Sequence, residues 1–149
     1  MNEVVISGLS DLQKLLNTLT AKIEQNVMRG ALRAGMKPVA IDARANAPKD
    51  TGLLAKDLKI STRASRGQIT VKLRATGKHA HLAHFAEYGV KPHKIGGGMH
   101  PGYDGNPFMR PALDQNAADV LVAAGNYIKN RLSTKHGIDT SDITIGDEE

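Results

Sequence analysis

The chain has no cysteine and no tryptophan, and aromatic residues make up only 3% of its 149 residues. Without cysteine there is neither a disulfide framework nor a thiolate metal site, which suits a reducing compartment. The scarcity of aromatic residues argues against a binder of single-stranded nucleic acid, because such proteins stack bases on aromatic side chains along a basic groove. The core must therefore be aliphatic and rich in alanine.

Long apolar runs are also missing. No stretch approaches the ~20 apolar residues that a membrane-spanning helix needs. Met1-Asn2-Glu3 has neither the basic nor the apolar region of a signal peptide. We therefore expect a soluble protein that is made inside the cell and has no membrane partner. A chain of this length buries roughly 70% of its unfolded surface, so we expect a single domain over residues 1–137.

Charge is distributed unevenly along the chain. There are 20 basic and 15 acidic residues, but five of the acidic residues and no Lys or Arg follow Gly137. The body therefore has 20 basic against 10 acidic residues. Such a body suits a polyanion such as DNA or acidic patches on partner proteins, and a plainly solvated surface explains it equally well. Residues 138–149 form an acidic tail that we expect to be mobile.

The N-terminal third predicts a long amphipathic helix. Val4-Val5-Ile6 has the pattern of a short strand, and Ser10 with Gln13 forms a capping box that opens the helix. Steps of three, four and seven residues then give one apolar stripe, made of Ile23, Val27, Ala31, Ala34, Ile41 and Ala45. Pro38 should kink this helix, and Pro48 should end it because the residue before proline avoids the helical region.

Two segments with alternating apolar residues, 58–63 and 69–75, lie on either side of Ser65-Arg66-Gly67. This pattern predicts a β-hairpin, and residues 79–88 predict a short helix. The stretch from Gly89 to Asn106 contains six glycines and two prolines, so we expect a long irregular loop. Loops of this length in compact domains are usually functional or disordered.

The last helix should begin near Pro111, since proline is tolerated in a first turn, and end near Gly137. Its apolar face consists of Leu113, Ala117, Val120, Leu121, Ala124, Ile128 and Leu132. Together these elements predict an α+β fold. It comprises a small antiparallel sheet packed by a long N-terminal helix and a C-terminal helix, with a long Gly-rich loop.

The sequence offers little for catalysis or metal binding. His79, His81 and His84 cluster, but neither helical nor strand geometry brings three imidazoles together, and no HExxH motif is present. Gly96-Gly97-Gly98 is not followed by the Lys and Ser or Thr of a phosphate-binding loop. We therefore expect no catalytic residues, no metal and no cofactor. A histidine-metal hydrolase is the alternative on this point.

Three segments together resemble a known family. They are Ala47-Pro48-Lys49-Asp50-Thr51-Gly52-Leu53-Leu54, Phe85-Ala86-Glu87-Tyr88-Gly89 and Pro107-Phe108-Met109-Arg110-Pro111-Ala112-Leu113. In this order they resemble the small tail-component family of lambdoid long-tailed bacteriophages, whose members are called neck, tail-completion or head–tail joining proteins and resemble the minor tail protein Z of phage lambda. The resemblance covers residues 4 to 132. Two departures are Val90, where the family commonly has Thr, and the Gly-rich loop.

The motif residues have expected structural roles whichever function applies. They are Pro48, Thr51, Gly52, Leu54, Glu87, Tyr88, Gly89, Pro107, Phe108, Arg110 and Pro111. Thr51 should cap the turn after Pro48, and Gly52 should permit a tight reversal. Gly89 should adopt a positive φ, and Phe108 should anchor the approach to the last helix.

The exposed residues are the candidates for partner binding. One basic face lies on the long helix, where Lys22, Arg29, Arg33, Lys37 and Arg44 align. A second lies on the outer side of the hairpin, with Lys59, Arg63, Lys72 and Arg74. Charged outer faces are usual on amphipathic elements, so solvated surfaces are the simplest interpretation and a surface facing DNA is the alternative. Candidate interface residues in the Gly-rich loop are Lys91, Lys94, Met99 and Tyr103.

The resemblance implies a structural virion protein and not an enzyme. Several copies, six by analogy with hexameric tail tubes, would form a ring at the head–tail junction or the head-proximal end of the tail. Its partners would be head–tail connector and tail-tube or tail-terminator proteins, with genomic DNA in the channel nearby. It would occupy the virion neck or tail, and the host cytoplasm during assembly. The alternatives are the tail terminator itself and, in a different class, a basic nucleic-acid-binding module.

Overall fold

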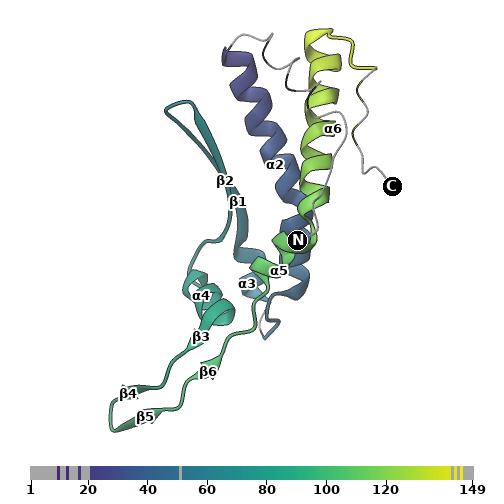
Figure 1. The fold of residues 1–149 in the computed structure, drawn as a ribbon. Helices are drawn as coiled ribbons and strands as arrows, with labels where there is room; N and C mark the ends of the chain where they lie inside the picture. The colour runs from purple at the N-terminus through teal and green to yellow at the C-terminus, as the bar shows by residue number, and fades with distance from the viewer. Residues whose placement is uncertain are drawn as a thin grey trace. The chain divides into compact units, whose positions relative to one another are not determined.

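The computed structural model describes residues 10, 13, 17, 21–50, 52–141, 143 and 145. The strand predicted at Val4-Val5-Ile6 and the cap predicted at Thr51 lie outside these residues. The chain forms two compact units. Unit 1 comprises Met1–Pro38, Ile60–Lys72 and Asn116–Glu149, and unit 2 comprises Val39–Lys59 and Leu73–Gln115. Helices and strands both occur (Figure 1), which confirms the predicted α+β class.

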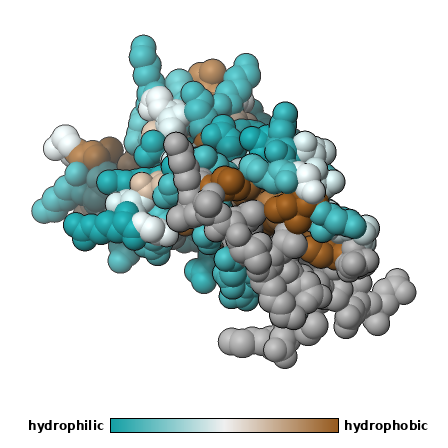
Figure 2. Space-filling model, turned by 90° about the horizontal axis from the view of Figure 1, so that it is seen from above, coloured by the Kyte–Doolittle hydropathy of each residue, from teal (hydrophilic) through white to brown (hydrophobic). Residues whose placement is uncertain are grey.

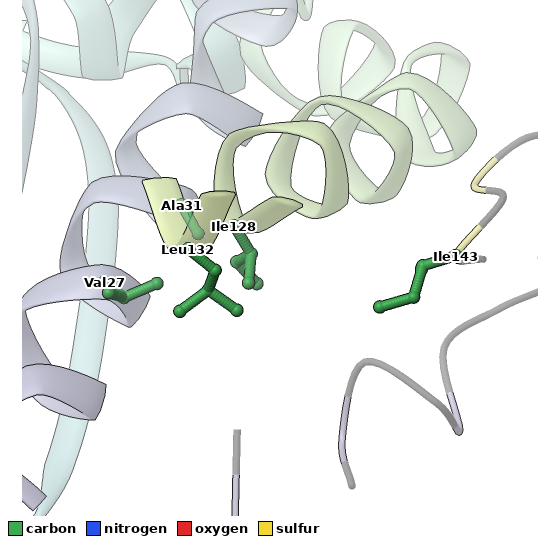
Figure 3. Close-up of a cluster of buried hydrophobic side chains, with 5 residues drawn as sticks. All are labelled: Val27, Ala31, Ile128, Leu132 and Ile143. Atoms are coloured by element: carbon green, nitrogen blue, oxygen red, sulfur yellow. The ribbon is translucent and has the colours of Figure 1, made fainter. Parts of the chain in front are cut away.

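Unit 1 is held together by an aliphatic core between two helices, α2 (Ala21–Asn46) and α6 (Ala117–His136). The buried cluster consists of Val27, Ala31, Ile128, Leu132 and Ile143. The side chains from the two helices point toward one another, and Ile143 approaches from the segment after α6 (Figure 3). Gly30 allows the two helices to pack closely, because a Cβ there would collide with the ring of Tyr127.

The buried row of α2 departs from the predicted stripe after Pro38. Every fourth residue is buried from the middle of the helix to just past its end: Val27, Ala31, Gly35, Val39, Ala43 and Ala47. Each step of four advances by about 40° around a helix with 3.6 residues per turn, so this row winds around the axis. Ile41, predicted in the stripe, is 66% exposed, and Ala45 is exposed too. The prediction was wrong here because it assumed that the buried residues stay on one side of the helix. They instead follow a ridge of i+4 neighbours, which winds around the helix axis.

The predicted hairpin is confirmed as β1 (Leu58–Ser65) and β2 (Gln68–Ala75). Arg66 and Gly67 connect the strands with φ values of 51° and 78°. Two positive φ values in succession define a type I′ turn, whose twist matches that of the flanking strands. Burial alternates along β2 as the sequence pattern predicts.

Unit 2 contains the end of α2, three short helices and four short strands. The helices are α3 (Leu53–Asp57), α4 (Ala80–Tyr88) and α5 (Met109–Gln115), and the strands are β3 (Gly89–Val90), β4 (His93–Ile95), β5 (Gly98–His100) and β6 (Tyr103–Asp104). The prediction that residues 89–106 form an irregular loop is therefore wrong in one respect. This stretch forms two antiparallel ladders, β3 with β6 and β4 with β5. We call residues 89–106 the arm. The described strands make three two-stranded sheets and not one small sheet.

The single C-terminal helix that the sequence predicts is divided in two. Asn116 separates α5 from α6, with φ −104° and ψ 17°. Leu113 and Leu121, predicted on the buried face, are 47% and 41% exposed, while Ile128 and Leu132 are buried as expected. Gly137 ends α6 as predicted, in the left-handed conformation with a φ of 64°.

The described residues after Gly137 lie against unit 1, and the mobility of residues 138–149 stays a prediction. Ile143 is only 7% exposed, and Ile138 and Ile145 pack against the same core cluster. The ammonium group of Lys129 donates a hydrogen bond to the carbonyl oxygen of Ile143 over 2.7 Å. The described part of the tail is therefore attached to unit 1 through its isoleucines, which the acidic composition concealed. The residues after Ile145 lie outside the described chain.

Candidate interaction surface

Glu87 joins the second sequence motif to the third. It lies at the end of α4 and is 7% exposed. Its Oε2 accepts hydrogen bonds from the backbone N–H groups of Phe108 (2.8 Å) and Met109 (3.0 Å), and its Oε1 accepts one from the N–H of Arg110 (3.0 Å). These donors belong to the start of α5, where no earlier helical carbonyl is available to accept them. One carboxylate therefore satisfies three donors and fixes α5 to α4.

The protonation of Glu87 follows from the same contacts. Burial raises the pKa of its carboxyl group, but the hydrogen bonds from Met109, Phe108 and Arg110 and the charge of Arg110 lower it by more. The net pKa lies below the ordinary value of 4.5, so the group is ionised at neutral pH. The ionised carboxylate therefore holds the start of α5, next to the buried Phe108, which is 2% exposed, and to Pro111. The structural roles expected of these motif residues stay predictions.

The arm begins at a narrow root formed by Gly89 and Gly105. Gly89 has the predicted positive φ, 75°, and a Cβ there would collide with the backbone of Gly105 and Tyr103. A Cβ on Gly105 would collide with the backbone of Gly89 in return. The N–H of Asn106 donates to the carbonyl oxygen of Ala86 over 2.8 Å. At the root, the backbones of Gly89 and Gly105 are therefore in contact, and the segment after β6 is hydrogen-bonded to α4.

The outer part of the arm is the β4–β5 ladder, in which His93 lies opposite His100 and Lys94 opposite Met99. Opposite residues share a face of a ladder and successive residues alternate between faces. The two histidines and Ile95 are therefore on one face, and Lys94 and Met99 are on the other. The imidazole rings of His93 and His100 stack with their centroids 5.1 Å apart.

The arm presents apolar and basic side chains together. Ile95 is 50% exposed, Met99 63% and Tyr103 51%, and Lys91 and Lys94 are exposed as well. β4 and β5 form the far end of the arm, away from α4 (Figure 1). The four residues predicted as interface anchors thus lie on one projecting hairpin, and their role in binding stays a prediction.

A groove with a volume of about 470 Å³ lies beside the base of the arm in unit 2. Its apolar lining includes Leu54, Leu82 and Phe85, and its polar lining includes Asp50 and Asp104. Leu82 and Phe85 are 41% and 39% exposed although both are large and apolar. The lining of the groove is therefore largely apolar and includes two carboxylates, and the sequence did not predict this groove.

The first motif forms the side of unit 2 next to this groove. Ala47 and Leu54 are buried, whereas Pro48 is exposed and lines the groove. Gly52 adopts the left-handed conformation with a φ of 68° directly before α3. In the other two motifs, Tyr88, Pro107 and Arg110 are exposed. The motif residues are thus divided between a buried scaffold and an exposed surface.

Both predicted basic faces are exposed. On α2 these are Arg29, Arg33 and Lys37, and on the hairpin they are Lys59, Arg63, Lys72 and Arg74. Hydrophilic residues (teal) predominate on the face that Figure 2 shows. Arg44 has a structural contact, since its guanidinium donates to the carbonyl oxygen of Leu58 over 2.7 Å. The side chain of Lys22 lies outside the described chain.

The histidines are distributed over separate contacts. The Nδ1 of His79 lies 3.3 Å from Oδ2 of Asp57, and the rings of His81 and His84 each contact Phe85 edge to face. Within the part of the chain that the structure describes, no three His, Asp or Glu side chains converge as a metal site would require. Nor is any described helix both long and apolar enough to cross a membrane.

One family model matches the chain over residues 10–89, and its description is "Bacteriophage HK97-gp10, putative tail-component". The chain belongs to this bacteriophage tail-component family. The resemblance inferred from the three motifs is therefore confirmed, and membership supports a structural role in the phage tail. The match includes α2, the hairpin and α4, and it ends at the root of the arm. No curated protein and no solved structure matches this tail component.

Only some of the contacts described above could be predicted from the sequence of the tail component. Glu87 was expected to be structural, but its three backbone partners were not predicted, because they follow it by more than 20 residues. The one signal was the Pro-Phe-Met-Arg-Pro segment itself, where a helix begins without a Ser, Thr, Asp or Asn immediately before it as a cap. A carboxylate from elsewhere in the chain was therefore needed.

Proposed function

We propose that this tail component forms a homo-oligomeric ring at the head–tail junction or at the head-proximal end of the tail. Six is the expected number of copies. The ring completes the tail and joins it to the head, so that it contacts connector proteins on one side and tail-tube or tail-terminator proteins on the other. It assembles in the host cytoplasm, remains in the virion and works through binding alone, without a catalytic step.

The observation that carries this proposal is the arm. Large apolar side chains on a projecting hairpin gain little in a free monomer, and clustered exposed apolar groups commonly mark interaction sites. Ile95, Met99 and Tyr103 are at least half exposed there, with Lys91 and Lys94 among them. In a phage tail component, an arm with exposed apolar side chains is best explained as a contact between proteins of the assembly.

The basic faces have a place in the same proposal. A ring at the neck surrounds the channel through which DNA passes, and cations lining a channel attract a polyanion. One basic face is the α2 face with Arg29, Arg33 and Lys37, and the second is the β1–β2 face with Lys59, Arg63, Lys72 and Arg74. At most one of the two looks toward this channel. The other face is solvated or meets an adjacent ring.

Deletion of the gene from its phage, followed by electron microscopy of the lysate, tests the proposal. We expect filled or emptied heads and separate tails of normal length. Expression of the wild-type chain in trans should restore joined particles and serves as the control. Tails of irregular length would favour the alternative of a tail terminator, because an uncapped tube continues to grow. Normal infectious particles would contradict both roles.

A further inference from the structure

We propose that the tip of the arm of one copy inserts into the groove at the base of the arm of the next copy. This proposal rests on the ring proposed above and identifies the contact that builds it. The occupant is a second copy of this chain. Four features of unit 2 support the assignment: the surface of the groove, the glycines of the tip, the charges of both, and the reach of the arm.

The groove has the surface of an unfilled binding site. Leu82 and Phe85 are each about two-fifths exposed beside the buried Leu54. The volume of about 470 Å³ lies within the range of roughly 300–1,000 Å³ that is usual for binding pockets. Covering these side chains would remove apolar surface from water, which is the main favourable term in protein association. The far end of the arm offers one exposed apolar side chain on each of its faces, Ile95 on one and Met99 on the other.

The glycines of the tip exceed what the isolated fold requires. Gly96 has a φ of 44° and so occupies a conformation that favours glycine, but Gly97 and Gly98 do not, and a Cβ on either would meet open space. Glycine in such positions lowers stability, because it loses more conformational freedom on folding than other residues do. A tip without side chains is useful where its backbone must pass close to another surface. The next copy provides such a surface in this proposal.

The charges of tip and groove are complementary. Lys94, in β4, is exposed at the far end of the arm, and Asp50 and Asp104 line the groove. Opposite charges at the edge of an interface favour the correct partner and orientation more than they add affinity. An acidic partner protein would also suit Lys94, but it would leave the apolar side chains at the far end without a matching surface.

An arm cannot fill its own groove. Asp104, in β6, forms part of the groove wall, whereas β4 and β5 form the far end of the arm, away from α4 (Figure 1). Pro101 and Gly102 separate β5 from β6, and the tip at Gly97 is seven residues from Asp104 along the chain. Donor and acceptor surfaces are therefore different parts of one chain, and their contact between copies is heterologous. Repeated heterologous contacts close into a ring when the rotation permits it.

Disulfide cross-linking tests the contact directly, because the chain has no cysteine of its own. Met99→Cys and Leu82→Cys are introduced into separate full-length chains, which are mixed at rising concentration and oxidised. Leu121→Cys in place of Leu82→Cys is the matched control, since Leu121 is equally exposed, at 41%, but belongs to α6. We expect the arm–groove pair to cross-link roughly tenfold more than the control pair, because the contact raises the effective concentration of the two thiols.

A second pair of variants tests the proposal by measuring the oligomeric state, without cross-linking. Met99→Asp should disable the arm and Phe85→Asp the groove. Because Phe85 is only 39% exposed, the circular dichroism spectrum and melting temperature of each variant must first match those of the wild type. Each variant alone should stay a single copy by native mass. A mixture retains one intact arm and one intact groove, so it should stop at pairs. Rings formed by either variant alone would overturn the proposal.

The outcomes separate this contact from the ring itself. Rings seen by native mass, with arm–groove cross-links no stronger than the control, would overturn the contact and leave the ring standing. Cross-links between two Met99→Cys chains alone would also overturn it, because they indicate a symmetric arm–arm contact. Single copies at every concentration, and no cross-link in particles assembled from the variants, would refute the contact and the ring together.

Discussion

Replacing Glu87 by glutamine tests the link between α4 and α5. The amide oxygen can keep the hydrogen bonds from Phe108 and Met109, but the NH₂ group then faces the N–H of Arg110, which loses its acceptor. A hydrogen bond to a charged group contributes about 1.5–3 kcal/mol, and a negative charge at a helix N-terminus adds about 0.3–1 kcal/mol. We therefore expect Glu87→Gln to lower the free energy of unfolding by about 2–4 kcal/mol at neutral pH.

The loss should depend on pH in one direction. The pKa of Glu87 in the folded protein lies below 4.5, its ordinary value, so folding favours the carboxylate. Its stabilising contribution is complete above pH 4.5 and is lost as the pH falls through the folded pKa. The difference in unfolding free energy between the wild type and Glu87→Gln should shrink accordingly in acid. Asp114→Asn removes an exposed carboxylate from α5 and should change stability by less than about 0.5 kcal/mol.

Urea denaturation at a series of pH values measures these free energies, and amide exchange at Phe108, Met109 and Arg110 reports the local effect. We expect faster exchange at all three in Glu87→Gln and unchanged exchange there in Asp114→Asn. Equal stability of Glu87→Gln and the wild type at neutral pH would refute the structural role. A difference that stays constant into acid would refute the ionised state.

Three further predictions concern a core residue, the arm and the charges. Phe108→Ala should lower the unfolding free energy by about 3–5 kcal/mol, since its ring is buried; an unchanged melting temperature with failed assembly would instead make Phe108 an interface residue. Gly89→Ala should cost about 1–3 kcal/mol because of its positive φ and its contact with Gly105. Gly97→Ala should instead raise the unfolding free energy by about 0.4–1 kcal/mol, because a Cβ there meets open space. Duplex DNA should bind the isolated chain weakly, and near-physiological salt should abolish binding, because each exposed basic face can neutralise only about three or four phosphates. Tight binding that survives this salt would favour a nucleic-acid-binding module.

Local patterns predicted the elements that depend on local contacts. The β1–β2 hairpin follows from alternation on both sides of Arg66-Gly67, and α4 from a short apolar repeat that ends at Gly89. Gly137 predicted the end of α6 because a left-handed residue closes a helix at low cost only when it lacks a Cβ. In each case the deciding residues lie within a few positions of the structure that they determine.

The features that escaped prediction depend on residues far apart in the sequence. The contact between Glu87 and the start of α5 spans the whole arm, and composition alone gives no sign of it. The buried row of α2 winds along i+4 neighbours, so Ile41 is exposed while Ala43 is buried. Ile143 is buried within an acidic segment, where Ile138 and Ile145 pack against the same core cluster. Which of these residues are buried depends on tertiary packing and not on local periodicity.

The root of the arm has a consequence for how relatives can diverge. Gly89 and Gly105 touch through their backbones, and no residue of β4 or β5 lines the groove, so the rest of unit 2 makes little demand on the side chains of that ladder. The outer part of the arm can therefore be lengthened, shortened or exchanged while Glu87 still holds α5 in place. Changes in this ladder can therefore alter which protein is bound at little cost to folding. Transplanting the β4–β5 ladder from one tail component to another should transfer its binding specificity.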